Sequence, residues 1–290
     1  MLTSRDIKVL HIEPTDVCQA ACPLCARETD INFQKHQQHH LTISQIKQHF
    51  TIDMIKNLHK MFMCGNYGDP AAGRHTLEIY RYFREINPDI VLGMNTNGSI
   101  QNTTWWTHLG KLFHLAQDYV VFSIDGLADT NHLYRRGVDW HKMMTNIRSY
   151  ISTGARAHWD MLVYRHNQHQ VDACQQLARD MGFSWFRAKV SKRSTQGDLA
   201  LPVGWQDPRV LAGPIACQAI KDQSIYIDAQ ARVHACCWLG SRQIDFDDDW
   251  QHIQESWTSD RPNPVCAETC RVGRNGSSFT NQWQQEVALC

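Results

Sequence analysis

Three cysteines near the N-terminus have the residue type and spacing of a metal site. Cys18, Cys22 and Cys25 follow a CxxxCxxC spacing within the stretch EPTDVCQAACPLC. Clustered thiolates bind zinc, copper(I) or iron-sulfur clusters. A structural zinc site needs four protein ligands, so His11 or another residue would have to supply the fourth. Three thiolates on a 4Fe-4S cluster leave one iron open, where a small molecule can bind and receive an electron.

The composition agrees with a metal-binding protein in a compartment where thiols stay reduced. The chain has 11 cysteines in 290 residues, and no secretory leader is recognisable, so we expect a cytoplasmic protein. Lysine plus arginine equals aspartate plus glutamate at 29 each, which disfavours nucleic acid and anionic membranes as partners. No apolar run approaches the roughly 18 residues that a membrane span requires. We expect the histidine-rich stretch KHQQHH, residues 35–40, to be a solvated loop.

The elements that position these cysteines alternate between strand and helix patterns. Apolar runs rich in β-branched and aromatic residues recur with helical segments between them, as expected of βα units around a parallel sheet. Polar motifs follow the strands, and the carboxyl ends of barrel strands meet at one mouth. The motifs should therefore lie close together. The predicted strands are residues 6–12, 60–64, 89–95, 119–124, 159–164 and 185–190.

Two further segments have a clear local pattern. Val171, Cys174, Ala178 and Met181 share one face of a helix that Gly182 should end, which makes Cys174 a core residue. After a Gly- and Pro-rich linker near residue 195, the stretch SIYIDAQARVHACCW predicts a hairpin with its turn at residues 228–231.

The CxxxCxxC loop after the first strand resembles the signature of the radical S-adenosylmethionine (SAM) enzymes. The resemblance implies an α/β fold with a partial (β/α)6 barrel over residues 1–195. It also implies that Cys18, Cys22 and Cys25 hold a 4Fe-4S cluster whose open iron binds the amino and carboxylate groups of SAM. Reductive cleavage of SAM would then yield a 5′-deoxyadenosyl radical that takes a hydrogen atom from the substrate, with the protein positioning the reactants.

Two loops resemble the SAM-binding motifs of this family. GNYGDP, residues 65–70, resembles the GGEP motif and offers Gly65, Asn66, Gly68 and Asp69 to the SAM ammonium, with aspartate in place of glutamate. The other reading of this stretch is a Gly-Asp-Pro turn. In NTNG, Asn95 and Asn97 should approach SAM or the substrate together with Thr96, although an Asn-Gly turn explains part of that motif.

The region after the fourth strand, FSIDGLADTNHLYR, resembles the maturase-like branch of the family. In that branch, the positions of Ser123 and Arg135 hold the SAM carboxylate, and an arginine fork suits a carboxylate. Arg136 is the neighbouring alternative. Asp125 is either a substrate contact or base, or part of an Asp-Gly turn.

Cys217, Cys236, Cys266 and Cys270 resemble the ligands of the auxiliary-cluster domain found in this branch, in its short twitch form rather than the full SPASM form. The resemblance implies a C-terminal domain over residues 196–290 with a second 4Fe-4S cluster, closed and suited to electron transfer. A zinc site of four cysteines has nearly the same sequence pattern. Ala231 occupies a turn position where this domain usually has glycine.

Four cysteines remain outside both sets. Cys64 and Cys237 are candidate hydrogen-atom donors, with burial in the core as the alternative, and Cys237 could also replace Cys236 as a ligand. Cys174 is assigned to the core, and Cys290 to a frayed terminus.

The resemblance implies an oxidoreductase that modifies peptides or proteins by oxidation, crosslinking, epimerisation or backbone excision. The expected partners are an electron donor such as flavodoxin or ferredoxin, a precursor peptide and a separate leader-recognition protein. A dehydrogenase or epimerase of aminocyclitols or sugars is the alternative enzyme. A non-catalytic zinc or iron-sulfur module is the alternative outside enzymes.

Overall fold

A single curved sheet organises the chain in a computed structural model. The structure describes residues 6–191, 193, 197–205, 213–239 and 261–271, together with 252, 253, 255 and 259. Within that part, the sheet has the order β6-β5-β4-β3-β2-β1-β7-β8 and is parallel except for the β7–β8 pair. The strands are β1 (Val9–Ile12), β2 (Lys60–Met63), β3 (Val91–Thr96), β4 (Tyr119–Ser123), β5 (Ala157–Val163), β6 (Trp185–Val190), β7 (Ser224–Ile227) and β8 (Val233–His234).

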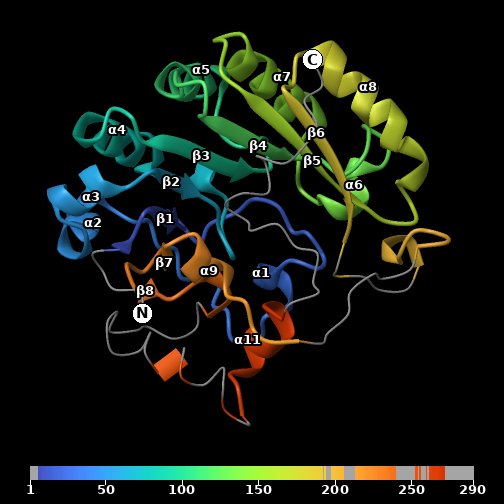
Figure 1. The fold of residues 1–290 in the computed structure, drawn as a ribbon. Coiled ribbons are helices and arrows are strands. Elements are labelled where there is room, and N and C mark those ends of the chain that lie inside the picture. Colours follow the sequence, from blue (N-terminus) through green and yellow to red (C-terminus); the bar gives the residue numbers. More distant parts are fainter. Residues whose placement is uncertain are drawn as a thin grey trace.

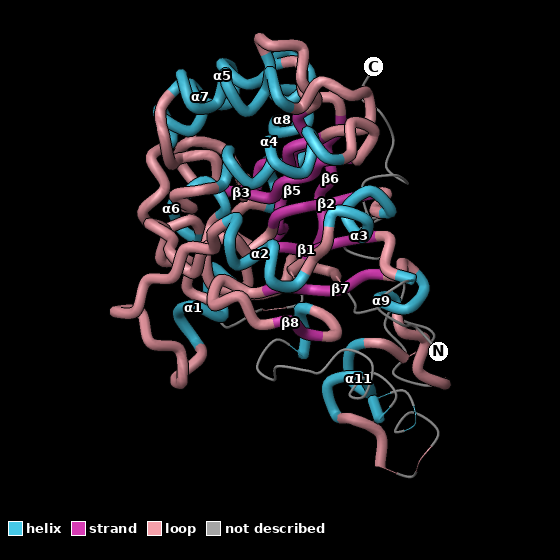
Figure 2. Tube along the Cα trace, turned by 90° about the vertical axis from the view of Figure 1, so that its left-hand side faces the viewer, coloured by secondary structure: helices cyan, strands magenta, loops and turns pink. Residues whose placement is uncertain are grey.

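The longer helices cover the outer face of this sheet, as Figures 1 and 2 show. None of the helices in the described segments is long and apolar enough to cross a membrane. The helices are α1 (Ala26–Thr29), α2 (Ile43–His49), α3 (Ile52–Asn57), α4 (Thr76–Ile86), α5 (Thr103–Leu112), α6 (Asn131–Tyr134), α7 (Trp140–Ile151), α8 (Val171–Met181), α9 (Gln218–Lys221) and α11 (Pro264–Thr269).

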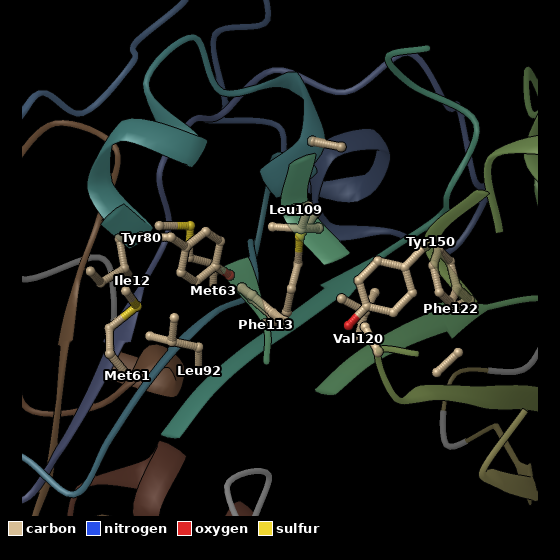
Figure 3. Close-up of a cluster of buried hydrophobic side chains, with 14 of the residues drawn as sticks. Ile12, Met61, Met63, Tyr80, Leu92, Leu109, Phe113, Val120, Phe122 and Tyr150 are labelled. Carbon is tan, nitrogen blue, oxygen red and sulfur yellow. The ribbon is translucent and has the colours of Figure 1, made fainter. Parts of the chain in front are cut away.

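The two faces of the sheet differ in chemistry because successive side chains of a strand point to opposite sides. Met61, Leu92 and Val120 face the helices in the large outer core, part of which is drawn in Figure 3. Tyr119 and Val121 belong to a separate small cluster on the inner face. Polar and charged side chains share that inner face, so the core that stabilises the fold lies outside and the chemistry lies inside.

The predicted partial (β/α)6 barrel is confirmed, with small differences in strand bounds. β1 begins at Val9 rather than at residue 6, and β5 begins at Ala157 rather than at residue 159. The helix predicted before the sixth strand is α8. It ends at Gly182, whose φ of +82° places it in the left-handed region, and Cys174 is fully buried as predicted.

The predicted hairpin is also confirmed, and its place in the sheet is new. β7 and β8 pair antiparallel, and the backbone N–H of Ala231 donates to the carbonyl of Asp228 across the turn. Ala231 has a φ of +62°, so the position where glycine was expected does adopt the glycine-favouring conformation. β7 continues the barrel sheet by pairing parallel with β1. The division at residue 195 and the second domain remain predictions.

Candidate functional site

The cysteine loop follows directly on β1 at the carboxyl edge of the sheet. Cys22 is buried, whereas Cys18 and Cys25 are half-buried, and Cys25 is the N-cap residue of α1. The backbone N–H of Cys25 donates to the Cys22 carbonyl at 3.0 Å, and that of Ala20 donates to Cys18 Sγ at 3.4 Å. The three thiols therefore share one short, ordered loop.

Burial keeps the thiols of Cys18 and Cys22 protonated in the absence of metal. It raises the pKa of Cys18 to about 12, and it raises the pKa of Cys22 as well. As the side chains stand, no group of three or more Cys, His, Asp or Glu residues in the described part of the chain is arranged to hold a metal ion. The three cysteines therefore fit a 4Fe-4S cluster in the type of their donor atoms, because each thiolate would ligate a different iron of the cluster. Loading must release the thiol protons.

The loop after β2 packs directly on the cysteine loop, and its glycines permit that contact. A Cβ atom on Gly68 would lie 1.9 Å from the carbonyl oxygen of Thr15, and one on Gly65 would lie 2.1 Å from the carbonyl oxygen of Gly68. The backbone N–H of Asp69 donates to the Val17 carbonyl at 2.9 Å. Glycine is thus required at both positions for close approach.

Asp69 connects the loop after β2 to the end of β3. Its carboxylate accepts hydrogen bonds from Thr96 Oγ1 at 2.7 Å, from the backbone N–H and Nδ2 of Asn97 at 2.7 Å each, and from the backbone N–H of Ala71 at 2.9 Å. Burial raises the pKa of this carboxyl. All four contacts come from the chain itself, so the visible role of Asp69 is to fix this corner. Its predicted contact with the SAM ammonium remains a prediction.

The NTNG loop reaches the cysteine loop as expected. Asn97 Oδ1 accepts a hydrogen bond from Gln19 Nε2 at 2.8 Å, and Asn97 Nδ2 lies 3.8 Å from Cys18 Sγ. Asn95 Oδ1 is buried and has no hydrogen-bond partner among the residues that the structure describes. A buried acceptor without a donor is costly. Asn95 therefore offers an open polar atom toward a ligand on the inner face of β3.

Arg135 follows α6 and stands between an acid and a cysteine. Its Nε donates to Asp125 Oδ2 at 2.6 Å, and its charge and hydrogen bond also act on Cys22. Asp125 is fully buried and also accepts from the backbone N–H of Leu162 at 2.6 Å. Ser123 is half-buried at the end of β4. The geometry brings Arg135 to the cysteine loop and makes Asp125 the residue that orients it.

Glu13, which the sequence analysis did not single out, is a central residue of the site. Its Oε1 accepts hydrogen bonds from the backbone N–H groups of Tyr67 at 2.7 Å and Gly68 at 3.0 Å, and its Oε2 accepts one from the Tyr226 hydroxyl. Burial raises its pKa to about 7. Glu13 and Tyr226 line a cavity of about 380 Å³ beside the hairpin turn. Its position one residue beyond the first strand, next to the cysteines, was the available signal.

A charged cluster on the inner face of β5 and β6 was also missed. Asp160 lies opposite Arg187 in the parallel register, and Lys189 is two residues further along β6. The Asp160 carboxylate forms ion pairs with both Arg187 and Lys189. The available signal was the spacing of two between Arg187 and Lys189 in β6, since alternate residues of a strand share a face.

Cys64 and Cys237 are brought together from distant parts of the sequence. Cys64 is among the groups that raise the pKa of Cys237, to about 12, although burial is the main cause. Asn66 Nδ2 donates to the Cys237 carbonyl at 2.9 Å, so the loop after β2 holds this residue. His11 Nε2 bonds the Cys64 carbonyl at 2.6 Å and is thereby turned to the inner face rather than to the cysteine loop.

The four cysteines of the C-terminal set line one small pocket. They come from the start of α9, the segment after β8, and α11 with its C-cap. Burial raises the pKa of Cys217 and of Cys236 to about 12. The other walls are mostly apolar, which suits a shielded cluster. The lining residues are Cys217, Cys236, Trp238, Leu239, Ile253, Val265, Cys266, Thr269 and Cys270. Cys290 lies outside the described residues.

Comparison with known families gives one match. The family model described as the Radical SAM superfamily matches residues 12–174, which is more than half of the chain and includes the cysteine motif and the loops after β2, β3 and β4. No curated protein matches the chain in a sequence search.

Solved structures share the fold at low sequence identity. The crystal structure of Streptococcus suis SuiB matches with a TM-score of 0.59 and 12% identity, covering 90% of this chain and 67% of that one. SuiB bound to the precursor peptide SuiA matches with a TM-score of 0.60 and 11% identity, covering 90% and 66%. Native anSMEcpe with bound AdoMet matches with a TM-score of 0.56 and 13% identity, covering 79% and 74%. The chain thus spans about two thirds of the length of SuiB.

Proposed function

This chain belongs to the radical SAM superfamily, whose fold binds SAM and a 4Fe-4S cluster, and from that premise we propose that it abstracts hydrogen from a peptide or protein substrate. The observation that carries the proposal is the convergence of three loops on the cysteine loop. They contribute Gly68, Asn97 and Arg135, each in contact with that loop or its thiols.

The proposal gives each group around the cysteine loop a task. Cys18, Cys22 and Cys25 hold the cluster, which together with SAM supplies an electron and a 5′-deoxyadenosyl radical when bound. Arg135 and Ser123 receive the SAM carboxylate, and Asp125 fixes the guanidinium of Arg135. Backbone groups of the Gly65–Asp69 loop receive the ammonium, while Asn95 accepts a hydrogen bond through its open Oδ1.

We assign the C-terminal set of cysteines to a second, closed 4Fe-4S cluster. Cys217, Cys236, Cys266 and Cys270 line one mostly apolar pocket, and four thiolates leave no iron open. Such a cluster would transfer electrons between the barrel and a donor such as flavodoxin or ferredoxin. That partnership fits a cytoplasmic protein.

Peptide-bound neighbours support a peptide substrate. SuiB has been solved with the precursor peptide SuiA, and anSMEcpe with the Cp18Cys peptide. A leader-recognition protein would deliver the precursor. A sugar or aminocyclitol as substrate is the competing outcome of the tests below.

Cys64 and Cys237 are proposed as hydrogen-atom donors to the substrate radical. Their thiols are protonated, because burial raises both pKa values well above neutral, and the S–H bond is the weak bond that a carbon radical can break. Turnover in D₂O should place one deuterium in an epimerised product. Cys64→Ala and Cys237→Ala should each be tested in the same way. If both variants form the epimerised product as the wild type does, the assignment of these cysteines as hydrogen-atom donors is wrong.

Anaerobic reconstitution tests the whole proposal. The protein should bind about eight irons, four for each cluster, and form 5′-deoxyadenosine from SAM and a reductant. Replacement of Cys18, Cys22 and Cys25 by alanine should leave about four irons and no 5′-deoxyadenosine. Cys174→Ala is the matched control, because this cysteine lies in the outer core. Two bound zinc ions without SAM cleavage would overturn the enzyme assignment.

A further inference from the structure

The cavity of about 380 Å³ lies where the hairpin turn after β7 faces the start of the cysteine loop. Its volume is in the range of small-molecule sites. Glu13 and Tyr226, which line it, are only 2% and 1% exposed. The glutamines that line it, Gln34, Gln37 and Gln230, are exposed. The cavity therefore has a buried floor and a mouth that opens to solvent.

One wall of the cavity is aromatic. The rings of Phe33 and Tyr67 stack with their centroids 4.4 Å apart and their planes at 10°. This pair already attracts one cation of the chain itself, because Arg27 Cζ lies over the Phe33 ring at 5.2 Å from its centroid. Arg27 does not line the cavity. Since the face of an aromatic ring is negative, this wall suits a ligand that combines carbon groups with a positive charge.

The charged side chains that line the cavity are mainly acidic. Asp228 is paired with Arg232 at 2.7 Å, and Asp16 with His39 Nδ1 at 2.6 Å. Asp30 differs, because it forms no ion pair with any residue that the structure describes. It accepts only from the Tyr67 hydroxyl at 2.7 Å and from the backbone N–H of Asn32 at 2.9 Å, and both hydrogen bonds lower its pKa. The acidic and basic residues of the lining are Glu13, Asp16, Asp30, His39, Asp228 and Arg232.

The lining does not suit a metal ion, and the cavity is not the proposed SAM site. No three Cys, His, Asp or Glu residues of the described segments are arranged to hold a metal ion. The side chains proposed to contact SAM, those of Asn95, Ser123 and Arg135, do not line the cavity. Its floor is nevertheless near the proposed hydrogen-atom donor Cys64, because burial and the carboxyl group of Glu13 both raise the pKa of that thiol. The cavity thus adjoins the proposed site of chemistry.

We propose that this cavity binds an ammonium group of the substrate, and that Asp30 is the carboxylate that receives it. Each oxygen of Asp30 accepts one hydrogen bond and has room for a second, while an ammonium group offers three donors. The carbon atoms that carry the ammonium pack on the ring of Tyr67. The ammonium belongs to a lysine of a peptide or to an aminocyclitol. This assignment deepens the proposed function and depends on it.

Calorimetry on the anaerobically reconstituted protein at low ionic strength tests the site directly. The probes are N-acetyl-lysine methylamide, its norleucine counterpart and the diaminocyclitol 2-deoxystreptamine. The lysine probe should bind about tenfold more tightly than the norleucine probe, which has no charge. Tighter binding of the lysine probe than of the cyclitol assigns the cavity to peptides, and the reverse order assigns it to small amines. Equal binding of the lysine and norleucine probes, without cyclitol binding, would overturn the proposal.

Matched variants separate ligand binding from a structural role. Asp30→Asn can keep both contacts, since its carbonyl accepts from Asn32 and its amide donates to the Tyr67 hydroxyl oxygen, but ammonium binding should weaken about tenfold. Gln230→Glu should tighten binding about two- to fivefold, and Gln230→Lys should weaken it as much, because only the charge at the mouth changes. Asp89→Asn, exposed at the opposite edge of the sheet before β3, is the control.

Unchanged ammonium binding in Asp30→Asn would refute the assignment. A shift in the same direction in Gln230→Glu and Gln230→Lys, or no shift in either, would refute it as well. If Asp30→Asn does not fold, the Gln230 pair decides alone. Formation of 5′-deoxyadenosine by the wild-type protein is measured in parallel, so failure of the proposed function is distinguishable from failure of this inference.

Discussion

Glu13→Gln is expected to stabilise the protein at pH 8 and to leave its stability unchanged near pH 4. Burial raises the pKa of Glu13 from 4.5 to about 7. Below about pH 4.5 the carboxyl is protonated in both the folded and the unfolded chain. As the pH rises from about 4.5 to about 7, the unfolded chain loses the proton first, so the free energy of unfolding falls through this window.

The magnitude follows from the two pKa values. The difference between about 7 and 4.5 corresponds to about 3 kcal/mol, since one pKa unit is about 1.4 kcal/mol. Glutamine carries no such cost. Its Oε1 can accept from the backbone N–H groups of Tyr67 and Gly68, and its amide can donate to the Tyr226 hydroxyl oxygen, so the three contacts of Glu13 are kept.

Urea unfolding of the metal-free, reduced protein between pH 4 and pH 8 measures this effect. The variant should exceed the wild type by up to about 3 kcal/mol at pH 8 and match it at pH 4. Glu85→Gln, on the exposed side of α4, is the control and should change nothing. A Glu13→Gln variant that is less stable than the wild type at pH 8, or that differs equally at all pH values, would refute the reasoning.

Three further variants, one of them with a matched control, test the backbone and the ion pair of the site. Ala231→Gly should raise the free energy of unfolding by about 0.5–1 kcal/mol in urea titrations, because φ is +62° there. Gly68→Ala should reduce iron bound at the cysteine loop, since its Cβ collides with that loop. Gly154→Ala, with no atom within 4 Å of its Cβ, should keep the iron and cost only about 1–2 kcal/mol. Asp125→Asn should cost about 3 kcal/mol and weaken SAM binding in equilibrium dialysis, because Arg135 loses its buried partner; unchanged binding would contradict its positioning role.

The parts that sequence predicts well are those determined by neighbours in the chain. Cys174 and Gly182 follow from helical periodicity and from the left-handed end of a helix. The convergence of the Asp69 and Asn97 loops on the cysteine loop follows from the parallel strand pattern alone, because all carboxyl strand ends meet at one edge.

The parts that sequence did not predict depend on contacts between distant segments. Hairpin signals near residues 228–231 are local and do not indicate that β7 pairs with β1. Glu13 contacts Tyr226 across 213 residues, and no pattern in either segment specifies the other. The ion pair of Asp160 and Lys189 was overlooked for a similar reason: alternation places each residue on one face of its own strand, and only the pairing of β5 with β6 shows that the two side chains meet.

The short loop after β2 lies against segments next to both cysteine sets. Gly68 touches the cysteine loop through its backbone, while Asn66, two residues earlier, holds the carbonyl of Cys237. Cys237 adjoins Cys236, which lines the C-terminal pocket. One loop therefore contacts the surroundings of both sets, through the backbone of Gly68 and the side chain of Asn66. If both sets carry clusters, any displacement of this loop must change the geometry of SAM binding and the path of the electron together.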